Sequence, residues 1–196
     1  ERGGEEGCGR RLEGLQGRLA LLSRRRRFAG HSVVAVFEGM DASGKGGAIR
    51  RITAALDARQ YRVVPISAPT SEEIARPYLW RFWFHLPPRG NYTIFDRSWY
   101  GRVLVERVRG LAPRRDWQRA YGEINEFEHE LAEHGVILAK FWLSLSPDEQ
   151  IARVRTFLAD KYREHPPEVI VAIADPAIRL VLEWRDPPWP APALVF

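Results

Sequence analysis

Cysteine and methionine are almost absent from this chain of 196 residues, which contains only Cys8 and Met40. A single cysteine excludes an internal disulfide and is typical of a reducing cytosol, so we expect a cytoplasmic protein. No run approaches the ~20 apolar residues of a membrane-spanning helix, and the Gly-, Glu- and Arg-rich start does not resemble a secretory signal. We therefore expect no membrane partner. Since no methionine stands at the start, we expect that the chain begins inside a longer reading frame or has been processed.

Lysine is also scarce, because Lys45, Lys140 and Lys161 are the only lysines among 30 basic residues. The formal net charge is +5, and arginine supplies nearly all of the positive charge. Codon bias in a GC-rich genome is one explanation. A polyanionic partner is the other, because the planar fork of arginine suits phosphate oxygens better than the point charge of lysine. Charge alone does not separate nucleic acid from polyphosphate or nucleotide.

Strand-like and helix-like patterns alternate along the chain. We expect a disordered extension at 1–9 and a single domain at 10–196, whose first segment is an amphipathic helix. Four runs predict strands: Val33–Phe37, Tyr61–Ile66, Tyr92–Phe95 and Val136–Leu143. The first is apolar and β-branched without alternation, which is typical of a strand buried on both faces. Helical patterns lie between the four runs, at Ile49–Leu56, Ser71–Phe84, Ser98–Val108 and Asp116–His134. This alternation predicts an α/β fold with a mostly parallel sheet, whose ligand site lies at the carboxyl ends of the strands.

Residues Gly39–Lys45 fit the spacing G-x-x-x-x-G-K between a predicted strand and a predicted helix. Glycines allow successive backbone amides to curl around phosphate oxygens, and the helix that follows adds its positive end. Lys45 can then reach the outer phosphates. The candidate phosphate-binding residues are Gly39, Ala42, Ser43, Gly44, Lys45, Gly46 and Gly47. An ordinary strand-to-helix turn is the alternative.

Two aspartates are candidate metal ligands and catalytic residues. The residue after Lys45 is Gly46, so the usual Ser or Thr hydroxyl ligand to Mg²⁺ is missing. Asp41 within the loop can supply an oxygen instead, because Mg²⁺ prefers carboxylates and water. Asp96 follows a buried strand, where the second acidic residue of phosphate-loop enzymes holds Mg²⁺. The alternatives are a turn-stabilising Asp41 and a helix-capping Asp96.

Arginines follow Asp96 closely. We expect Arg97 and Arg102 to clamp phosphates, and Arg107 to pair with an acidic neighbour. The aromatic cluster in residues 80–84 can stack on a nucleobase, but core packing is the interpretation that we favour.

Four segments resemble the polyphosphate kinase 2 family. Val36–Ile49 is similar to its Walker A segment, which also lacks the Ser or Thr, and Phe95–Arg102 with Glu106–Val108 is similar to its Walker B segment. Lys140–Leu143 with Asp148–Gln150 resembles the strand and helix that lead into the lid. Pro77–Trp83 is similar to the second domain of the tandem-domain members, the polyphosphate:AMP phosphotransferases. The resemblance covers about Leu12 to Val154.

The resemblance implies a thymidylate-kinase-like fold, that is, a P-loop three-layer sandwich. It implies Mg²⁺-dependent phosphoryl transfer between inorganic polyphosphate and a nucleotide, with AMP giving ADP. Carried over by position, the working residues are Asp41, Lys45, Asp96, Arg97 and Arg102. Arg153 matches an arginine at the start of the lid helix, where it would bind phosphate. We also expect a homo-oligomer.

The chain departs from the family pattern after about residue 155. Phe157 stands where a lid arginine is expected, and Val169–Ala174 is compatible with a fifth strand. Three alternatives stay open. The first is an ATP-dependent nucleoside or nucleotide monophosphate kinase of the same fold. The second is a basic nucleic-acid-binding domain, which leaves the Gly-Lys loop unexplained. The third is a subunit that binds substrates without turning them over.

Overall fold

The computed structural model describes residues 2–165, 169–171 and 193–195. These residues divide into two units, the first formed by residues 1–39 and 44–143, the second by residues 40–43 and 144–196. None of the helices in the described part of the chain is both long and apolar enough to cross a bilayer.

A parallel sheet of four strands forms the centre of the first unit. The strands are β1 (Ser32–Gly39), β2 (Tyr61–Pro65), β3 (Tyr92–Asp96) and β4 (Val136–Leu143). They lie in the order β2-β3-β1-β4. The predicted α/β class and all four predicted strands are therefore confirmed. Because the strands are parallel, their carboxyl ends meet at one edge of the sheet.

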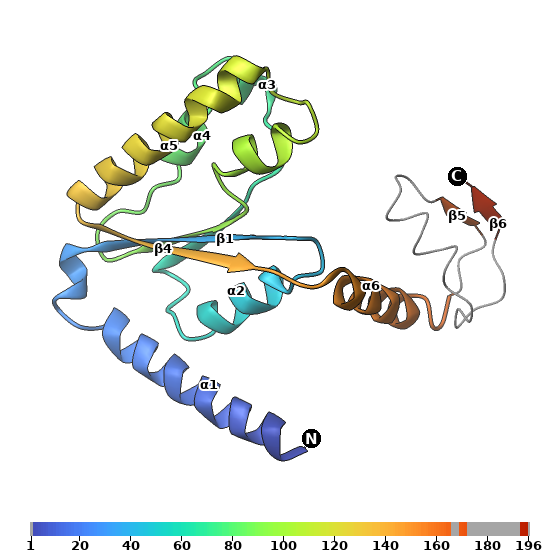
Figure 1. The fold of residues 1–196 in the computed structure, drawn as a ribbon. Helices are drawn as coiled ribbons and strands as arrows, with labels where there is room; N and C mark the ends of the chain where they lie inside the picture. Colours follow the sequence, from blue (N-terminus) through green and yellow to red (C-terminus); the bar gives the residue numbers. More distant parts are fainter. Residues whose placement is uncertain (1, 166–168, 172–192, 196) are drawn as a thin grey trace. The chain divides into compact units, whose positions relative to one another are not determined.

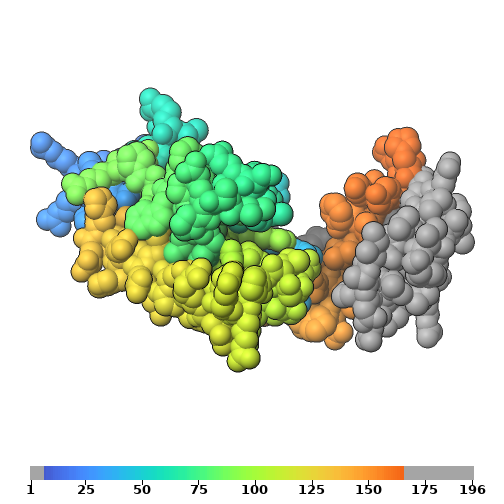
Figure 2. Space-filling model, turned by 90° about the horizontal axis from the view of Figure 1, so that it is seen from above, coloured from blue at the N-terminus to red at the C-terminus, as the bar shows by residue number. Residues whose placement is uncertain are grey.

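Helices cover both faces of this sheet (Figure 1). Side chains alternate along β1, so Val34 and Val36 face one side while Ala35 and Phe37 face the other. The first pair packs in a core with α5 (Arg114–Glu133), and the second packs against α2 (Lys45–Thr53). Figure 2 looks onto the α5 side, where the green and yellow segments around residues 70–130 cover the sheet. The first unit is thus the three-layer arrangement that we predicted.

The remaining elements of the first unit connect these layers. Helix α1 (Arg2–Ser23) is tied to the last turn of α2 by a hydrogen bond from Gln16 Nε2 to the carbonyl of Arg51 (2.7 Å). A short 3₁₀ turn, η1 (Phe28–Gly30), leads into β1. Although we expected residues 1–9 to be disordered, α1 begins at Arg2. Once a helix is nucleated, each further residue adds a hydrogen bond, and α1 extends into this segment.

Two predicted helices differ from what the structure shows. The pattern over Ser71–Phe84 predicted one helix, but the structure has α3 (Ser71–Ile74) and α4 (Trp80–Trp83) on either side of Pro77. Proline disfavours helical geometry at the residue before it, which separates the two turns. The N-cap of α3 is Thr70, which forms a capping box with Glu73. Within Ser98–Val108, η2 (Arg102–Glu106) is a π-helical turn.

The second unit contains α6 (Pro147–Lys161) and a two-stranded sheet. Strand β5 (Val169–Val171) pairs in parallel with β6 (Ala193–Val195). The expected strand within Val169–Ala174 is therefore confirmed over Val169–Val171, where it pairs with β6 and not with the four-stranded sheet. Residues 172–174 lie outside the described part of the chain.

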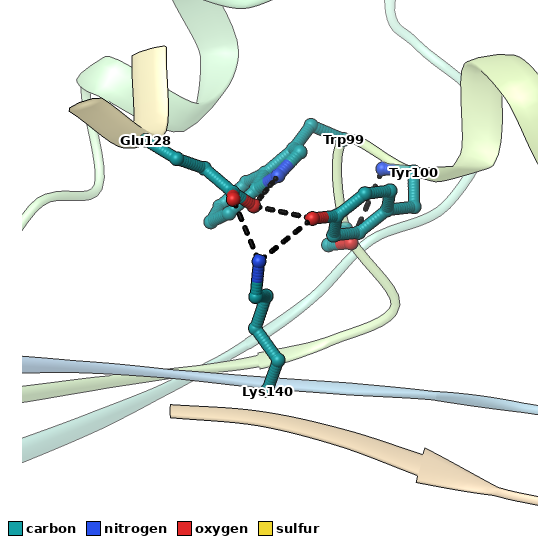
Figure 3. Close-up of polar contacts among 5 residues, drawn as sticks. Trp99, Tyr100, Glu128 and Lys140 are labelled. Atoms are coloured by element: carbon teal, nitrogen blue, oxygen red, sulfur yellow. Dashed lines mark hydrogen bonds and ion pairs between the residues drawn. The ribbon is translucent and has the colours of Figure 1, made fainter. Parts of the chain in front are cut away.

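A partly exposed polar network links α5 to the sheet beside the first unit's larger core. Glu128 of α5 accepts hydrogen bonds from Trp99 Nε1 (3.0 Å), Tyr100 Oη (2.5 Å) and Lys140 Nζ (2.7 Å) (Figure 3). Lys140 also donates to Tyr100 Oη (3.2 Å). The indole of Trp99 is 0 % exposed and lies edge-on to Phe82, Phe95 and Phe127.

The burial of Trp99 gives a prediction for stability. We expect Trp99→Ala to lower the free energy of unfolding by about 3–5 kcal/mol, because a large cavity remains in a packed core. Trp142 is 60 % exposed, so Trp142→Ala is the matched control. It should lower the free energy of unfolding by less than ~1 kcal/mol. Denaturant unfolding measures both. Equal losses in the two variants would contradict this core.

The phenol of Tyr100 gives a prediction for alkaline pH. Burial, followed by the hydrogen bond to Glu128, raises the pKa of Tyr100 in the folded state. An unfolded tyrosine ionises near pH 10, so its burial stabilises the fold below that pH and less above it. The unfolding free energy should therefore fall less steeply in Tyr100→Phe than in the wild type as the pH passes ~10. Parallel pH profiles of the two proteins would contradict the assignment.

Candidate active site

The carboxyl ends of β1 and β3 lie side by side. In their parallel register Val36 pairs with Phe95 and Phe37 pairs with Asp96. The chain leaves β1 towards α2 and leaves β3 towards α5, which cover opposite faces of the sheet. Open α/β sheets bind ligands at such carboxyl ends. The amino end of α2 and the turn after β3, which both belong to the first unit, are therefore the candidates for a ligand site.

The segment after β1 has the backbone of a phosphate loop. Gly39 (φ 142°) and Gly44 (φ 92°) have positive φ angles, which glycine adopts at little cost. Ala42 (φ 62°) is also left-handed. Helix α2 starts at Lys45, whose Nζ donates to the carbonyl of Gly39 (2.7 Å) and so closes the loop. The amino end of α2 and the predicted lysine are thus at the carboxyl end of β1.

Gly46 and Gly47 occupy the first turn of α2. A Cβ at Gly47 would lie 3.2 Å from Arg51 Nη1, whereas a Cβ at Gly46 would meet no atom within 4 Å. The missing Ser or Thr hydroxyl at position 46 is therefore not a consequence of crowding.

Residues 40–43 of the loop belong to the second unit, with α6. The Ser43 amide donates to the carbonyl of Met40 (3.2 Å), and Gln150 Nε2 donates to the carbonyl of Asp41 (2.9 Å). Ser43 Oγ is buried and, among the described residues, has no hydrogen-bond partner. A buried hydroxyl without a partner is costly unless a ligand satisfies it, which suits the predicted phosphate contact of Ser43.

Asp96 and Arg97 form the turn after β3. The carbonyl of Asp96 accepts from the Ile66 amide (2.9 Å), and the Arg97 amide donates to the carbonyl of Phe37 (2.9 Å). Arg97 has a φ of 67°, a left-handed conformation that is uncommon outside glycine and clusters at functional sites. The nearest helical turn, η2, begins six residues after Asp96 and is preceded by Gly101 at its N-cap, so the capping interpretation of Asp96 is wrong.

Two more arginines lie in or beside η2. Arg102 Nε pairs with Glu106 (2.9 Å), and its guanidinium lies over the ring of Tyr78 (4.5 Å). The contact with Glu106 is an ion pair without a hydrogen bond from Nε, and a guanidinium has five N–H donors, so the phosphate role of Arg102 stays a prediction. Among the described residues Arg107 has no acidic partner, contrary to our expectation. It donates to Tyr121 Oη (2.8 Å) and lies over the ring of Trp117 (4.5 Å), two side chains of α5.

Glu38 is a buried acid that our sequence reasoning missed. It is 8 % exposed and accepts a hydrogen bond from Ser98 Oγ (2.6 Å). Burial raises the pKa of the Glu38 carboxyl, although the Ser98 hydrogen bonds and the charges of Lys45 and Arg97 act in the opposite direction. The signal in the sequence is an isolated acid within an apolar strand run, directly before the glycine loop.

A cavity of about 220 Å³ lies beside this acid. Its lining comes from the carboxyl halves of β1 and β4 and from the segment before α5: Val36, Glu38, Tyr100, Leu104, Lys140, Phe141 and Trp142. The polar groups on this wall already bind one another, through the Glu128 network and the Glu38–Ser98 pair. The cavity therefore adds apolar surface rather than a further set of polar ligands.

The aromatic cluster at residues 80–84 is divided between core and surface. Phe82 is 3 % exposed and packs edge-on to Phe95 and Trp99, as the core-packing interpretation predicted. Phe84 is 70 % exposed and stacks on Trp80. A nucleobase pocket built from these rings remains a hypothesis.

The oxygen donors suit a magnesium ion that shares its coordination with substrate. Among residues 2–165, 169–171 and 193–195, no group of three or more His, Cys, Asp or Glu side chains could hold a metal by itself. Mg²⁺ usually takes one or two carboxylates plus phosphate oxygens and water, which needs no such group. Asp41 and Asp96 provide two carboxylates, but they belong to different units, so their convergence on one ion stays a prediction.

The sequence and the fold both resemble known proteins. The polyphosphate kinase 2 (PPK2) family model matches residues 4–167. A polyphosphate:AMP phosphotransferase of Pseudomonas aeruginosa is 59 % identical over 154 residues, and one of Pseudomonas syringae pv. tomato is 61 % identical over 138 residues. These matches take in 79 % and 70 % of this chain but only 31 % and 28 % of the relatives.

Solved structures agree with the family assignment. A crystal structure described as a polyphosphate kinase 2 from Pseudomonas aeruginosa PA01 superposes with a TM-score of 0.74 at 57 % identity, covering 81 % of this chain and 33 % of that one. Polyphosphate kinase 2 from Arthrobacter aurescens TC1 gives 0.72 at 33 % identity, covering 79 % and 56 %. The chain spans about a third of the polyphosphate:AMP phosphotransferases that it matches. By sequence, fold and phosphate loop together, it belongs to the polyphosphate kinase 2 family.

Proposed function

We propose that this chain transfers phosphoryl groups between inorganic polyphosphate and a nucleotide, with AMP as the acceptor that gives ADP. The observation that carries the proposal is the parallel pairing of β1 with β3, because β1 leads into the phosphate loop that Lys45 ends and β3 ends in Asp96. The names of the relatives that are 59 % and 61 % identical, polyphosphate:AMP phosphotransferases, support this choice of substrates. Other relatives are named for ADP or GDP, so the acceptor needs its own test.

The phosphate loop would bind the phosphoanhydride through its backbone. Amides of Gly44, Gly46 and Gly47 stand at the amino end of α2, where unpaired N–H groups and the helix dipole favour an anion. The Ser43 hydroxyl adds a donor. Lys45 would exchange its bond to the Gly39 carbonyl for the transferring phosphoryl group and offset the charge that spreads over its oxygens.

Arginines would orient the phosphate chain. Arg97 is exposed at the turn after β3, and Arg102 is held by Glu106 and Tyr78. Arg153 lies on α6, where it pairs with Glu149 (2.7 Å), so its phosphate contact would require a change of partner. Planar guanidinium groups fix the direction of a phosphate as well as neutralising it.

Asp41 and Asp96 would hold Mg²⁺. When bound, Mg²⁺ would withdraw charge from the phosphate oxygens and so stabilise the transition state. We also propose that the protein works in the cytoplasm and as a homo-oligomer, and that nucleic acid is not its partner. A nucleic-acid-binding domain would have no use for the Gly39–Lys45 loop.

The first test removes charge from the site. Lys45→Ala and Asp96→Asn should each lower kcat at least ~100-fold in steady-state assays of ADP formation, because each removes electrostatic stabilisation at the transferring group. Arg59→Ala and Asp57→Asn are the matched controls, since these two residues pair with each other away from the site. Wild-type rates in Lys45→Ala or Asp96→Asn would rule out the proposed site.

The second test compares phosphoryl donors. With AMP, ADP, GMP and GDP as acceptors, we expect Mg²⁺-dependent transfer from polyphosphate and the fastest turnover with AMP. ATP in place of polyphosphate should be a poor donor. Activity with ATP alone would identify an ATP-dependent kinase of the same fold instead. Tight polyphosphate binding without transfer to any acceptor would identify a non-catalytic subunit.

A further inference from the structure

Glu38 has an environment that is unusual for an acid. It continues the row of Val34 and Val36 along β1, on the face that packs against the core of α5. Because burial raises its pKa, the ionised form of Glu38 is costly there. A leucine would fit this row without that cost. The carboxylate must therefore be explained by the partner that it binds, Ser98.

The partner belongs to the turn that carries Asp96 and Arg97. Ser98 is 2 % exposed, and its Oγ donates to Glu38 Oε1 while it accepts from the Tyr100 amide (3.2 Å). The Arg97 amide donates to the carbonyl of Phe37, the residue before Glu38. Two successive residues of β1 thus bind two successive residues of the turn after β3.

These bonds hold a strained backbone. A left-handed conformation in a residue other than glycine is strained and persists only where its surroundings fix it. Arg97 has such a conformation. Its own amide and the hydroxyl of the next residue, Ser98, both donate hydrogen bonds to β1. Without the Glu38–Ser98 bond, the turn can relax while the rest of the sheet stays intact.

We propose that Glu38 is a positioning residue: through its hydrogen bond to Ser98 it fixes the turn that presents Asp96 and Arg97 to the phosphoanhydride. Glu38 acts through Ser98 and touches neither substrate. The kinetic test of this proposal rests on the proposed function, whereas the test by amide spectra does not. In this proposal the hydrogen bond to Ser98 fixes the turn, and the charge of Glu38 does not.

The test uses variants that separate the hydrogen bond from the charge and from packing. Glu38→Leu keeps the volume but removes the acceptor, and Ser98→Ala removes the donor. Each should lower kcat ~10- to 100-fold, because small misplacements of catalytic groups cost up to ~10². The KM for polyphosphate should change little, since the phosphate loop still binds it. Glu38→Gln and Ser98→Thr keep the acceptor oxygen and the hydroxyl, and should restore wild-type kcat to within about threefold.

The double variant and a control complete the kinetic design. Because Glu38→Leu already removes the Glu38–Ser98 bond that Ser98→Ala removes, the double variant should be no slower than the slower single variant. Glu133→Gln changes an exposed acid on α5 and should leave kcat unchanged. Thermal unfolding of every variant shows whether a loss of kcat reflects loss of folded protein.

A structural readout does not need activity. In ¹H–¹⁵N spectra, the amide signals of residues 96–100 should shift in Glu38→Leu and Ser98→Ala but stay near their wild-type positions in Glu38→Gln. If the wild type transfers no phosphate from any donor, the proposed function fails and these spectra still decide the proposal. Unshifted amides, wild-type kcat in Glu38→Leu, a Glu38→Gln variant as slow as Glu38→Leu, or multiplicative losses in the double variant would each overturn it.

Discussion

The parallel pairing of β1 with β3 is the constraint on which the candidate site depends. It brings two segments about sixty residues apart in sequence to the same edge of the sheet, in a register that sets Phe37 against Asp96. One segment contributes backbone amides and Lys45, and the other contributes a carboxylate and an arginine. The bond from the Arg97 amide to the Phe37 carbonyl continues the contact between these segments beyond the end of β3. Neither segment alone is a phosphoryl-transfer site.

Most helices and strands of the first unit could be predicted from the spacing of apolar residues in the sequence. Val136–Leu143 coincides with β4, because an apolar run that follows directly on a glycine turn at Gly135 is typical of a strand. The break at Pro77 was missed because the aromatic residues around it kept a helical spacing across the proline. The starts and ends of elements depend on single residues such as Thr70, which periodicity does not weigh.

The candidate site was predictable where the chemistry lies in a local motif. The loop before α2 and Asp96 at the end of β3 could be identified from spacing alone. Partners from distant segments could not be identified in this way. The residues around Glu38 do not indicate its bond to Ser98, and those around Arg107 do not indicate its contacts with Trp117 and Tyr121. Such pairs are decided by tertiary packing, which a sequence motif does not encode.

We propose that Lys45 at the start of α2 and Asp96 at the end of β3 act on the same phosphoanhydride. A crystal structure of the chain with tripolyphosphate and Mg²⁺ would decide this. The proposal predicts an anion on the amides of residues 42–47, with Lys45 Nζ on an outer phosphate and the Asp96 carboxylate facing the metal. An anion bound elsewhere, with the loop closed on itself and Asp96 turned away, would contradict it.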